Sequence, residues 1–261
     1  MKALKLFEEV YNTEIIEKNF SRRDAMTKGL GFGLKAALAA IPLGFFSALN
    51  NKANAAPTSA VTDILNFALT LEYLESTFYT MGLASSGLIP SSDMTIMNQI
   101  NKHENEHVAT LMSTITTLGG TPVTKPTFDF TAGGTYSDVF TNYQTFLALA
   151  NAFEDTGVRA YKGQAVGLMG SGAVLTAALD IHSVEARHAS EVRRLRGLKG
   201  WISNAESNGL PAAIYAGEDN TTQGGVNVTT ITTTPTVSIT EAFDEPLTMS
   251  AVLAIAGPFI K

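Results

Sequence analysis

The sequence predicts an all-α protein, built as a four-helix bundle with one long crossover between the second and third helices. Four long stretches carry apolar residues at helical spacing. The links between them are short, long and short in turn, which suits an antiparallel bundle with a single crossover. In every stretch a glutamate interrupts the middle of the apolar stripe, where a charged carboxylate is costly unless something compensates it.

The composition is that of a globular protein with a sizeable core, since 45% of the 261 residues are hydrophobic and 16% are charged. The net charge of −6 gives no reason to expect nucleic acid or an anionic membrane surface as a partner. The absence of cysteine excludes disulfides, thiolate metal sites, iron–sulfur clusters and cysteine lipidation. Any metal ion must therefore be held by histidine, carboxylate or water.

Residues 1–55 are predicted to be a twin-arginine export signal. Arg22 and Arg23 precede an apolar run from about Leu30 to Leu49, and Ala53-Asn54-Ala55 has the small-x-small pattern of a cleavage site. We therefore expect the precursor to meet the twin-arginine export machinery, with cleavage near Ala55. The mature protein would be periplasmic or secreted. An uncleaved membrane anchor is the alternative.

The first two helices have clear boundary signals. The first is expected over residues 58–82, with Thr58 or Ser59 as its N-cap. The second is expected over residues 91–118 and ends at Gly119-Gly120.

A loop containing prolines and glycines separates this helical pair from the next one. The third helix is expected from about Ser137 to Leu168. Gly170 then breaks the chain, and the fourth helix is expected from about Ser171 to Leu198. The bundle would thus occupy residues 56–199.

Residues 200–261 differ in composition and are expected to pack on the bundle as a C-terminal arm and a terminal helix. The segment 220–240 is rich in Thr, Val and Gly with partial alternation, which predicts an extended arm or a weak hairpin. The following stretch predicts a short helix, capped by Thr248 or Ser250 and ended by Gly257-Pro258.

The interrupting glutamates form a pattern that repeats in the two halves of the bundle. Each half has one lone glutamate and then, almost the same distance later, a Glu-x-x-His pair. One such pair is common on helix surfaces, but two matched pairs in apolar stripes predict a buried metal site. Two divalent ions, each with one histidine and shared carboxylates, would neutralise the four carboxylates. The expected ligands are Glu72, Glu104, His107, Glu154, Glu185 and His188.

Three further residues are candidates for catalysis. Tyr79 and Tyr161 each follow a lone glutamate by seven residues, so they either hydrogen-bond to the ligands or belong to the core. Glu75 and Gly157 each follow it by three. We expect Gly157 to border the open coordination side of the metal centre, where a small oxidant would enter. Glu75 would lie near the opposite metal as a seventh ligand or proton donor, unless it faces solvent.

Other polar residues are expected at the surface. His103 and His182 would lie on helix flanks, outside the metal site. A basic run closes the fourth helix and predicts a solvated face that complements the helix dipole. This run consists of Arg193, Arg194, Arg196 and Lys199.

The helical segments resemble the ferritin-like superfamily, and most closely the exported ferritin-like domain proteins of bacteria that are related to plant desiccation-associated proteins. The resemblance covers roughly residues 58–198 and is carried by LEYLESTFY, HENEHVATL, FEDTGVRAY and VEARHASEVRRL. The C-terminal EAFDEPLTMSAVLAIAGPFI is also similar to that branch. The resemblance implies a carboxylate-bridged di-metal centre. Glu72 and Glu154 match its lone glutamates, and Glu104 with His107 and Glu185 with His188 match its Glu-x-x-His pairs.

Three functions stay open at this point. The first is an exported di-iron or mixed Fe/Mn oxidoreductase that reacts with O2 or peroxide. The second is a peroxide dismutase similar to manganese catalase, and the third is a non-enzymatic metal-sequestering or stress protein. The export signal and the Thr-rich tail depart from cage-forming ferritins, although a homo-oligomer remains an alternative.

Overall fold

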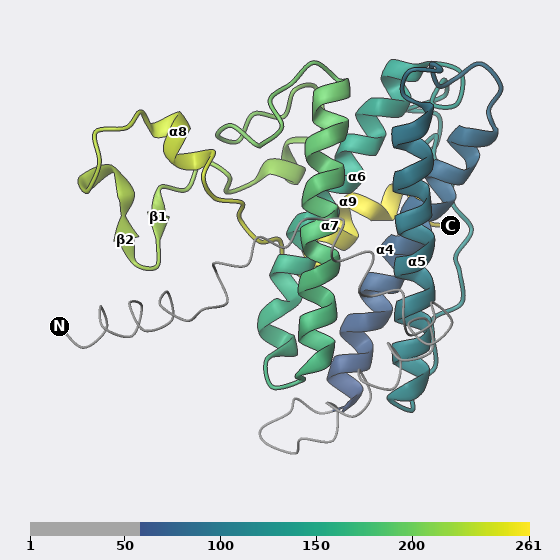
Figure 1. Ribbon diagram of the computed structural model, residues 1–261, viewed down its shortest axis with the longest axis horizontal. Coiled ribbons are helices and arrows are strands. Elements are labelled where there is room, and N and C mark those ends of the chain that lie inside the picture. The colour runs from purple at the N-terminus through teal and green to yellow at the C-terminus, as the bar shows by residue number, and fades with distance from the viewer. Residues whose placement is uncertain (1–57) are drawn as a thin grey trace, which may run out of the picture. The chain divides into compact units, whose positions relative to one another are not determined.

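Four long helices lie side by side and form the bundle (Figure 1). The computed structural model describes residues 58–261, so the predicted signal segment lies outside the described residues. Helix α4 packs mainly on α5 and helix α6 mainly on α7, while α4 and α6 also meet. This confirms the predicted all-α bundle with one long crossover. The helices are α4 (Thr58–Ala84), α5 (Met94–Thr117), α6 (Tyr143–Gln164) and α7 (Ala173–Leu195).

The second helix ends where its glycines predict. Gly119 has a φ of 79°, which favours glycine, and the N–H of Gly120 donates to the carbonyl of Ile115. Helix α7 ends in the same way at Gly197, whose φ is 74°. Such bonds satisfy carbonyl groups that the last helical turn leaves without a partner.

The third helix begins later than expected. Residues 131–141 form successive turns, and α6 starts only after Asn142. Asn142 is extended, with φ −123° and ψ 111°, and its side chain accepts the N–H of Gln144 at 3.0 Å. An N-cap asparagine of this kind fixes the helix start, so the predicted start at Ser137 is wrong.

Short elements complete the chain after the four long helices. The Thr-rich segment contains an antiparallel hairpin in which Thr222 pairs with Asn227. The predicted terminal helix is α9, and its cap is Thr248, whose hydroxyl accepts the N–H of Ala251 at 3.2 Å. Among the described residues, no helix combines the length and apolar character needed to span a membrane. The short elements are η1 (Ala165–Leu168), η2 (Ala212–Tyr215), β1 (Thr222–Gln223), β2 (Val226–Asn227), η3 (Val228–Thr230), α8 (Thr236–Thr240), α9 (Met249–Ala256) and η4 (Gly257–Phe259).

The bundle core consists of two apolar clusters. One is rich in aromatic rings, with Phe78 and Phe146 stacked at a centroid distance of 4.6 Å. The other is mainly aliphatic and is built around Leu65, Leu69 and Ile115. The interrupting glutamates are buried between these clusters, where the surrounding side chains exclude water.

The C-terminal segment covers the outer side of α6. Helix α9 packs on α6, and the N–H of Leu247 donates to the carbonyl of Arg159. The chain end pairs with the crossover through a bridge between Phe128 and Ile260. As a result, nearly all α6 residues from Phe146 onward are buried, on the outer face as well as the inner one.

Candidate metal centre

The six expected ligand residues come together in the middle of the bundle. A spacing of three residues places both members of a Glu-x-x-His pair on one helix face. All four carboxylates have 0% exposure and both imidazoles at most 8%. The residues are Glu72 on α4, Glu104 and His107 on α5, Glu154 on α6, and Glu185 and His188 on α7.

Two groups of four residues could each hold a metal ion, and they share two members. Within each group the candidate ligand atoms all lie within 4.8 Å of one another. Glu104 and Glu185 belong to both groups. Glu72 and His107 complete the first group, and Glu154 and His188 complete the second.

Each shared carboxylate presents one oxygen to each histidine. His107 Nδ1 lies 3.3 Å from Glu104 Oε2 and 3.0 Å from Glu185 Oε1. His188 Nδ1 lies 2.8 Å from Glu104 Oε1 and 3.9 Å from Glu185 Oε2. This is the orientation that a carboxylate bridging two cations requires.

Several of these atoms face one another without forming hydrogen bonds. Glu104 Oε1 and His188 Nδ1 are 2.8 Å apart, yet neither has a hydrogen-bond partner among the described residues. Glu154 Oε2 and both carboxylate oxygens of Glu185 are also buried without such a partner. Buried polar atoms are normally hydrogen-bonded. Lone pairs converging on one point are what a bound cation would satisfy, so the residues fit a metal centre.

The electrostatics of the cluster also favour a cation. Burial and the neighbouring Glu104 raise the pKa of Glu72 to about 8. Burial opposes ionisation of Glu104 as well, but the adjacent His107 and His188 outweigh it and lower the pKa of Glu104 to about 2. Burial, followed by other carboxylates, raises the pKa of Glu185. Without a metal ion the cluster must therefore retain protons at neutral pH.

The two tyrosines connect the halves of the centre crosswise. The hydroxyl of Tyr79 on α4 donates to Glu154 Oε1 at 2.5 Å. The hydroxyl of Tyr161 on α6 donates to Glu72 Oε1, also at 2.5 Å. Both rings are buried, so each tyrosine is a hydrogen-bond donor as well as a core residue. Each one fixes the orientation of a lone glutamate.

Glu75 and Gly157 lie together rather than on opposite sides of the centre. A Cβ atom on Gly157 would lie 3.2 Å from Glu75 Oε1 and 3.5 Å from Glu185 Oε2. Glu75 has 3% exposure, so it does not face solvent. The expectation of opposite sides is wrong because α4 and α6 pack against each other, and residues at equal offsets meet across that interface. The glycine leaves room for a fifth carboxylate, that of Glu75, beside Glu185.

His103 contacts a ligand, contrary to the expectation of a flank position outside the site. Its Nδ1 lies 2.9 Å from His188 Nε2, and the side-chain nitrogen of Gln99 lies 2.5 Å from His103 Nε2. Which ring nitrogen carries the proton depends on the tautomer. The position of His103 within α5 does not predict this contact. The contact depends on how α7 packs against α5.

Arg193 is buried, so the predicted fully solvated basic face is wrong at this position. Its exposure is 2%, and its Nε and Nη2 donate to the carboxylate of Asp155 at 3.0 and 2.5 Å. The hydroxyl of Tyr215 donates to the same carboxylate at 2.7 Å. The C-terminal segment therefore completes a buried network on the outer face of α6.

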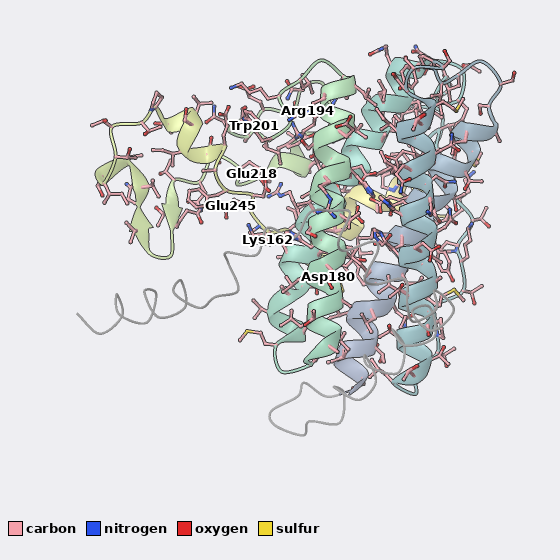
Figure 2. The ribbon with its side chains drawn as sticks, viewed as in Figure 1. Lys162, Asp180, Arg194, Trp201, Glu218 and Glu245 are labelled. Atoms are coloured by element: carbon pink, nitrogen blue, oxygen red, sulfur yellow. The ribbon has the colours of Figure 1, made fainter. Side chains whose placement is uncertain are left out.

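A second buried arginine attaches the segment that contains the β1–β2 hairpin, residues 218–245, to the bundle. This segment is called the hairpin segment below. Arg159 has 0% exposure and lies 2.8 Å from Glu218 Oε1. That oxygen also accepts the N–H of Glu245 at 3.0 Å. Figure 2 shows Glu218 and Glu245 near Lys162, where the hairpin segment meets the helices. These charges lie outside the carboxylate cluster and serve to dock the segment.

A protein-family model described as a ferritin-like domain matches residues 60–198. The matched segment holds all four long helices except the first two residues of α4, and with them the six candidate ligands, Glu75 and both tyrosines. No curated protein matches the chain.

Proposed function

Because the chain belongs to the ferritin-like domain family, we propose that it is an exported di-metal carboxylate oxidoreductase that reacts with O2 or peroxide at a Fe or Fe/Mn centre. The observation that carries this proposal is the sharing of Glu104 and Glu185 by the two ligand groups. Two ions held by common carboxylates lie close enough to act together on one small molecule. A pair of separate storage sites has no need of this arrangement.

The protein's own residues would prepare the centre for such a reaction. When bound, iron or manganese would supply a Lewis acid for the oxidant and electrons for its reduction. Tyr79 and Tyr161 hold Glu154 and Glu72 in fixed orientations. The apolar clusters on both sides exclude water, which strengthens the electrostatic interactions inside.

Elemental analysis with oxidation assays tests the proposal. The full-length protein, purified without chelator and offered Fe(II) or Mn(II), should bind about two ions per chain. The Fe(II) form should be oxidised by O2 or peroxide, and Glu185→Ala should lose both binding and reaction. His182→Ala provides a matched control outside the cluster. Less than about one ion per chain would refute the proposal.

The same assays separate the other two functions. Oxygen release from peroxide by the manganese form would indicate a dismutase similar to manganese catalase. Two tightly bound ions without any turnover would indicate metal sequestration. Either result would replace the proposed oxidoreductase.

We propose that Glu75 takes part in the reaction, as a proton donor or as a seventh ligand beside Glu185. Its carboxyl lies in the space left by Gly157, next to Glu185 Oε2. Glu75→Gln keeps the shape of the side chain but removes the ionisable proton. If Glu75 is a proton donor, the variant should keep its metal content but show an altered pH profile of turnover. If Glu75 is a ligand, the variant should bind one ion more weakly. A variant identical to the parent in both measurements would exclude either role.

We also propose that the protein is exported by the twin-arginine route and acts outside the cytoplasm. The proposal rests on Arg22, Arg23 and the cleavage pattern that ends at Ala55. Changing both arginines to lysine should trap the precursor in the cytoplasm, as measured by immunoblotting of cell fractions. Arg194→Lys, on the exposed side of α7, is the control. Normal export of the double variant would mean that another route is used.

A further inference from the structure

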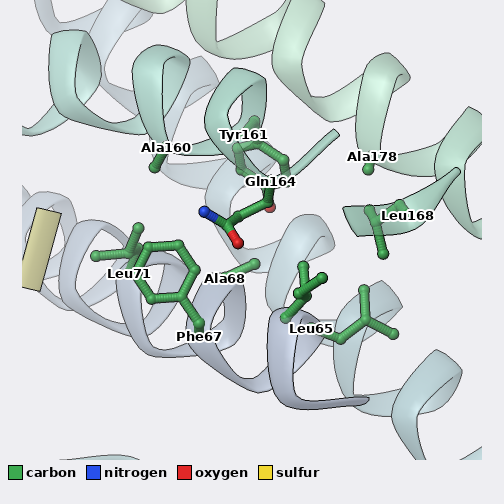
Figure 3. A pocket seen from close by; sticks show the side chains of 10 residues that line it. Leu65, Phe67, Ala68, Leu71, Ala160, Tyr161, Gln164, Leu168 and Ala178 are labelled. Carbon is green, nitrogen blue, oxygen red and sulfur yellow. The ribbon is translucent and has the colours of Figure 1, made fainter. Parts of the chain in front are cut away.

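An apolar pocket lies between α4 and the junction of α6, η1 and α7 (Figure 3). Its walls are mostly aliphatic and include Leu65, Ala68, Leu168 and Ala178. Among the described residues that line it, only Tyr161 and Gln164 have polar side chains. Figure 3 shows the Gln164 amide pointing towards α4 across this space.

Tyr161 belongs both to the pocket wall and to the surroundings of the candidate metal centre. Tyr161 lines the pocket, and its hydroxyl donates to Glu72 Oε1 at 2.5 Å. Ala68 precedes Glu72 by one helical turn on α4, so both lie on the same helix face. Tyr161 therefore links the pocket to the carboxylate cluster, with its ring in the pocket wall and its hydroxyl on Glu72.

Size and polarity together limit what the pocket can hold. The space measures about 310 Å³ with its open mouth included, but its interior has room for only one small molecule or atom. An ordered water needs two to four polar partners, and this lining offers only the Gln164 amide, because the Tyr161 hydroxyl already donates to Glu72. A metal ion or a peroxide would lose its hydration or its hydrogen bonds on entry. An apolar diatomic molecule loses nothing and gains contacts.

We propose that this pocket binds molecular oxygen and delivers it to the Glu72 side of the centre. The inference rests on the proposed function, because it assumes that O2 is an oxidant of the bound metal. It goes further by giving O2 an entry site of its own. Peroxide, being polar, would have to reach the metals by another path.

Xenon under pressure provides a probe of the pocket that does not depend on metal loading or activity. In crystals of the purified full-length protein, xenon should bind within the walls formed by Leu65, Ala68 and Tyr161. Ala68→Leu should abolish this binding by filling the space from α4. Ala178→Leu fills the pocket from α7 and should also abolish xenon binding. It provides a second test in case Ala68→Leu does not fold. Ala109→Leu, a solvent-facing change of the same size on α5, should bind xenon like the parent.

Stopped-flow oxidation of the Fe(II) form tests delivery. Both pocket variants should react roughly tenfold more slowly with O2 than the parent, while the peroxide reaction stays within roughly twofold. Ala109→Leu should match the parent with both oxidants. The absence of xenon from the parent, or equal slowing with both oxidants, or no slowing with O2, would overturn the proposal. Xenon binding in a parent that reacts with neither oxidant would instead refute the proposed function, while supporting an apolar gas site.

Discussion

At the residue scale, Gly157 permits a fifth carboxylate, that of Glu75, to lie beside the shared Glu185. Glu75 occupies the volume that a larger side chain on α6 would take. A stability measurement can test this interpretation without any bound metal.

Gly157→Leu should destabilise the protein by roughly 1–3 kcal/mol, because the new side chain overlaps the Glu75 carboxyl. Glu75→Ala in the same chain should recover most of that loss, since the two substitutions compete for one space. Chemical denaturation of both single variants and the double variant gives the coupling free energy. Additive effects would show that Gly157 and Glu75 do not share this volume.

His103 illustrates how a residue beside a ligand can affect one half of the centre. Its ring contacts His188, which belongs to the second ligand group alone. His103→Ala should therefore weaken the binding of one ion by roughly tenfold and leave the other largely unchanged. Metal titration should resolve the two steps, and His103→Gln should restore part of the affinity. Equal weakening of both ions, or none, would contradict this positioning role.

At the element scale, α6 is a helix whose middle is buried on all sides and whose outer face is polar. Asp155 on this face accepts hydrogen bonds from Arg193 on α7 and from Tyr215 in the C-terminal segment. The network joins two bundle helices to the segment that covers them. The C-terminal segment therefore contributes to the stability of the bundle.

Removing Asp155 should be costly, because it leaves Arg193 buried without its partner. We expect Asp155→Ala to lower the free energy of unfolding by roughly 3–5 kcal/mol. Asp155→Leu combined with Arg193→Met should recover most of this loss, since apolar side chains then replace this buried ion pair. The control is the ion pair of Lys199 and Glu241. Lys199 Nζ lies 2.6 Å from Glu241 Oε1, and the Lys199 side chain is 58% exposed. Lys199→Ala should change stability by no more than about 0.5 kcal/mol. If denaturant unfolding ranked the free energies of unfolding of these variants in another order, the network would not have the stabilising role described here.

At the scale of the whole molecule, the metal-free protein should be most stable in mild acid. Glu72 has an ordinary pKa of 4.5 and a folded pKa of about 8, raised by burial and Glu104. Between these pH values the folded state binds a proton that the unfolded chain has lost, so stability falls as the pH rises. Glu154 and Glu185 are shifted in the same direction by burial. Glu104 is shifted downwards, so its contribution is lost only as the pH falls below 4.5 towards about 2.

Calorimetry of the metal-free and metal-loaded forms checks this pH dependence. The difference in melting temperature should be larger at about pH 8 than at about pH 5. Glu72→Gln should flatten the pH dependence of the metal-free form, because it removes one of the raised pKa values. A melting temperature that does not respond to chelation at any pH would argue against a filled core site.

Local signals in the sequence were sufficient to predict the helices and the residues that gather in the bundle centre. Apolar periodicity and glycine stops are local signals, and they located the four long helices to within a few residues, apart from the start of α6. The Glu-x-x-His spacing is also local, because it depends on one helix face. The repeat of this pattern in both halves was enough to nominate Glu72, Glu104, His107, Glu154, Glu185 and His188.

Which residues meet between helices depends on the packing of the folded chain and could not be predicted from local patterns. Periodicity tells which face of a helix is apolar, but not how two helices are rotated and shifted relative to each other. The contacts of Glu75 with Gly157 and of His103 with His188 depend on that arrangement. The burial of Arg193 depends on a segment that follows the bundle in the chain and folds back over α6. A basic residue at a helix end is normally solvated, and here the covering segment and Asp155 together remove it from water.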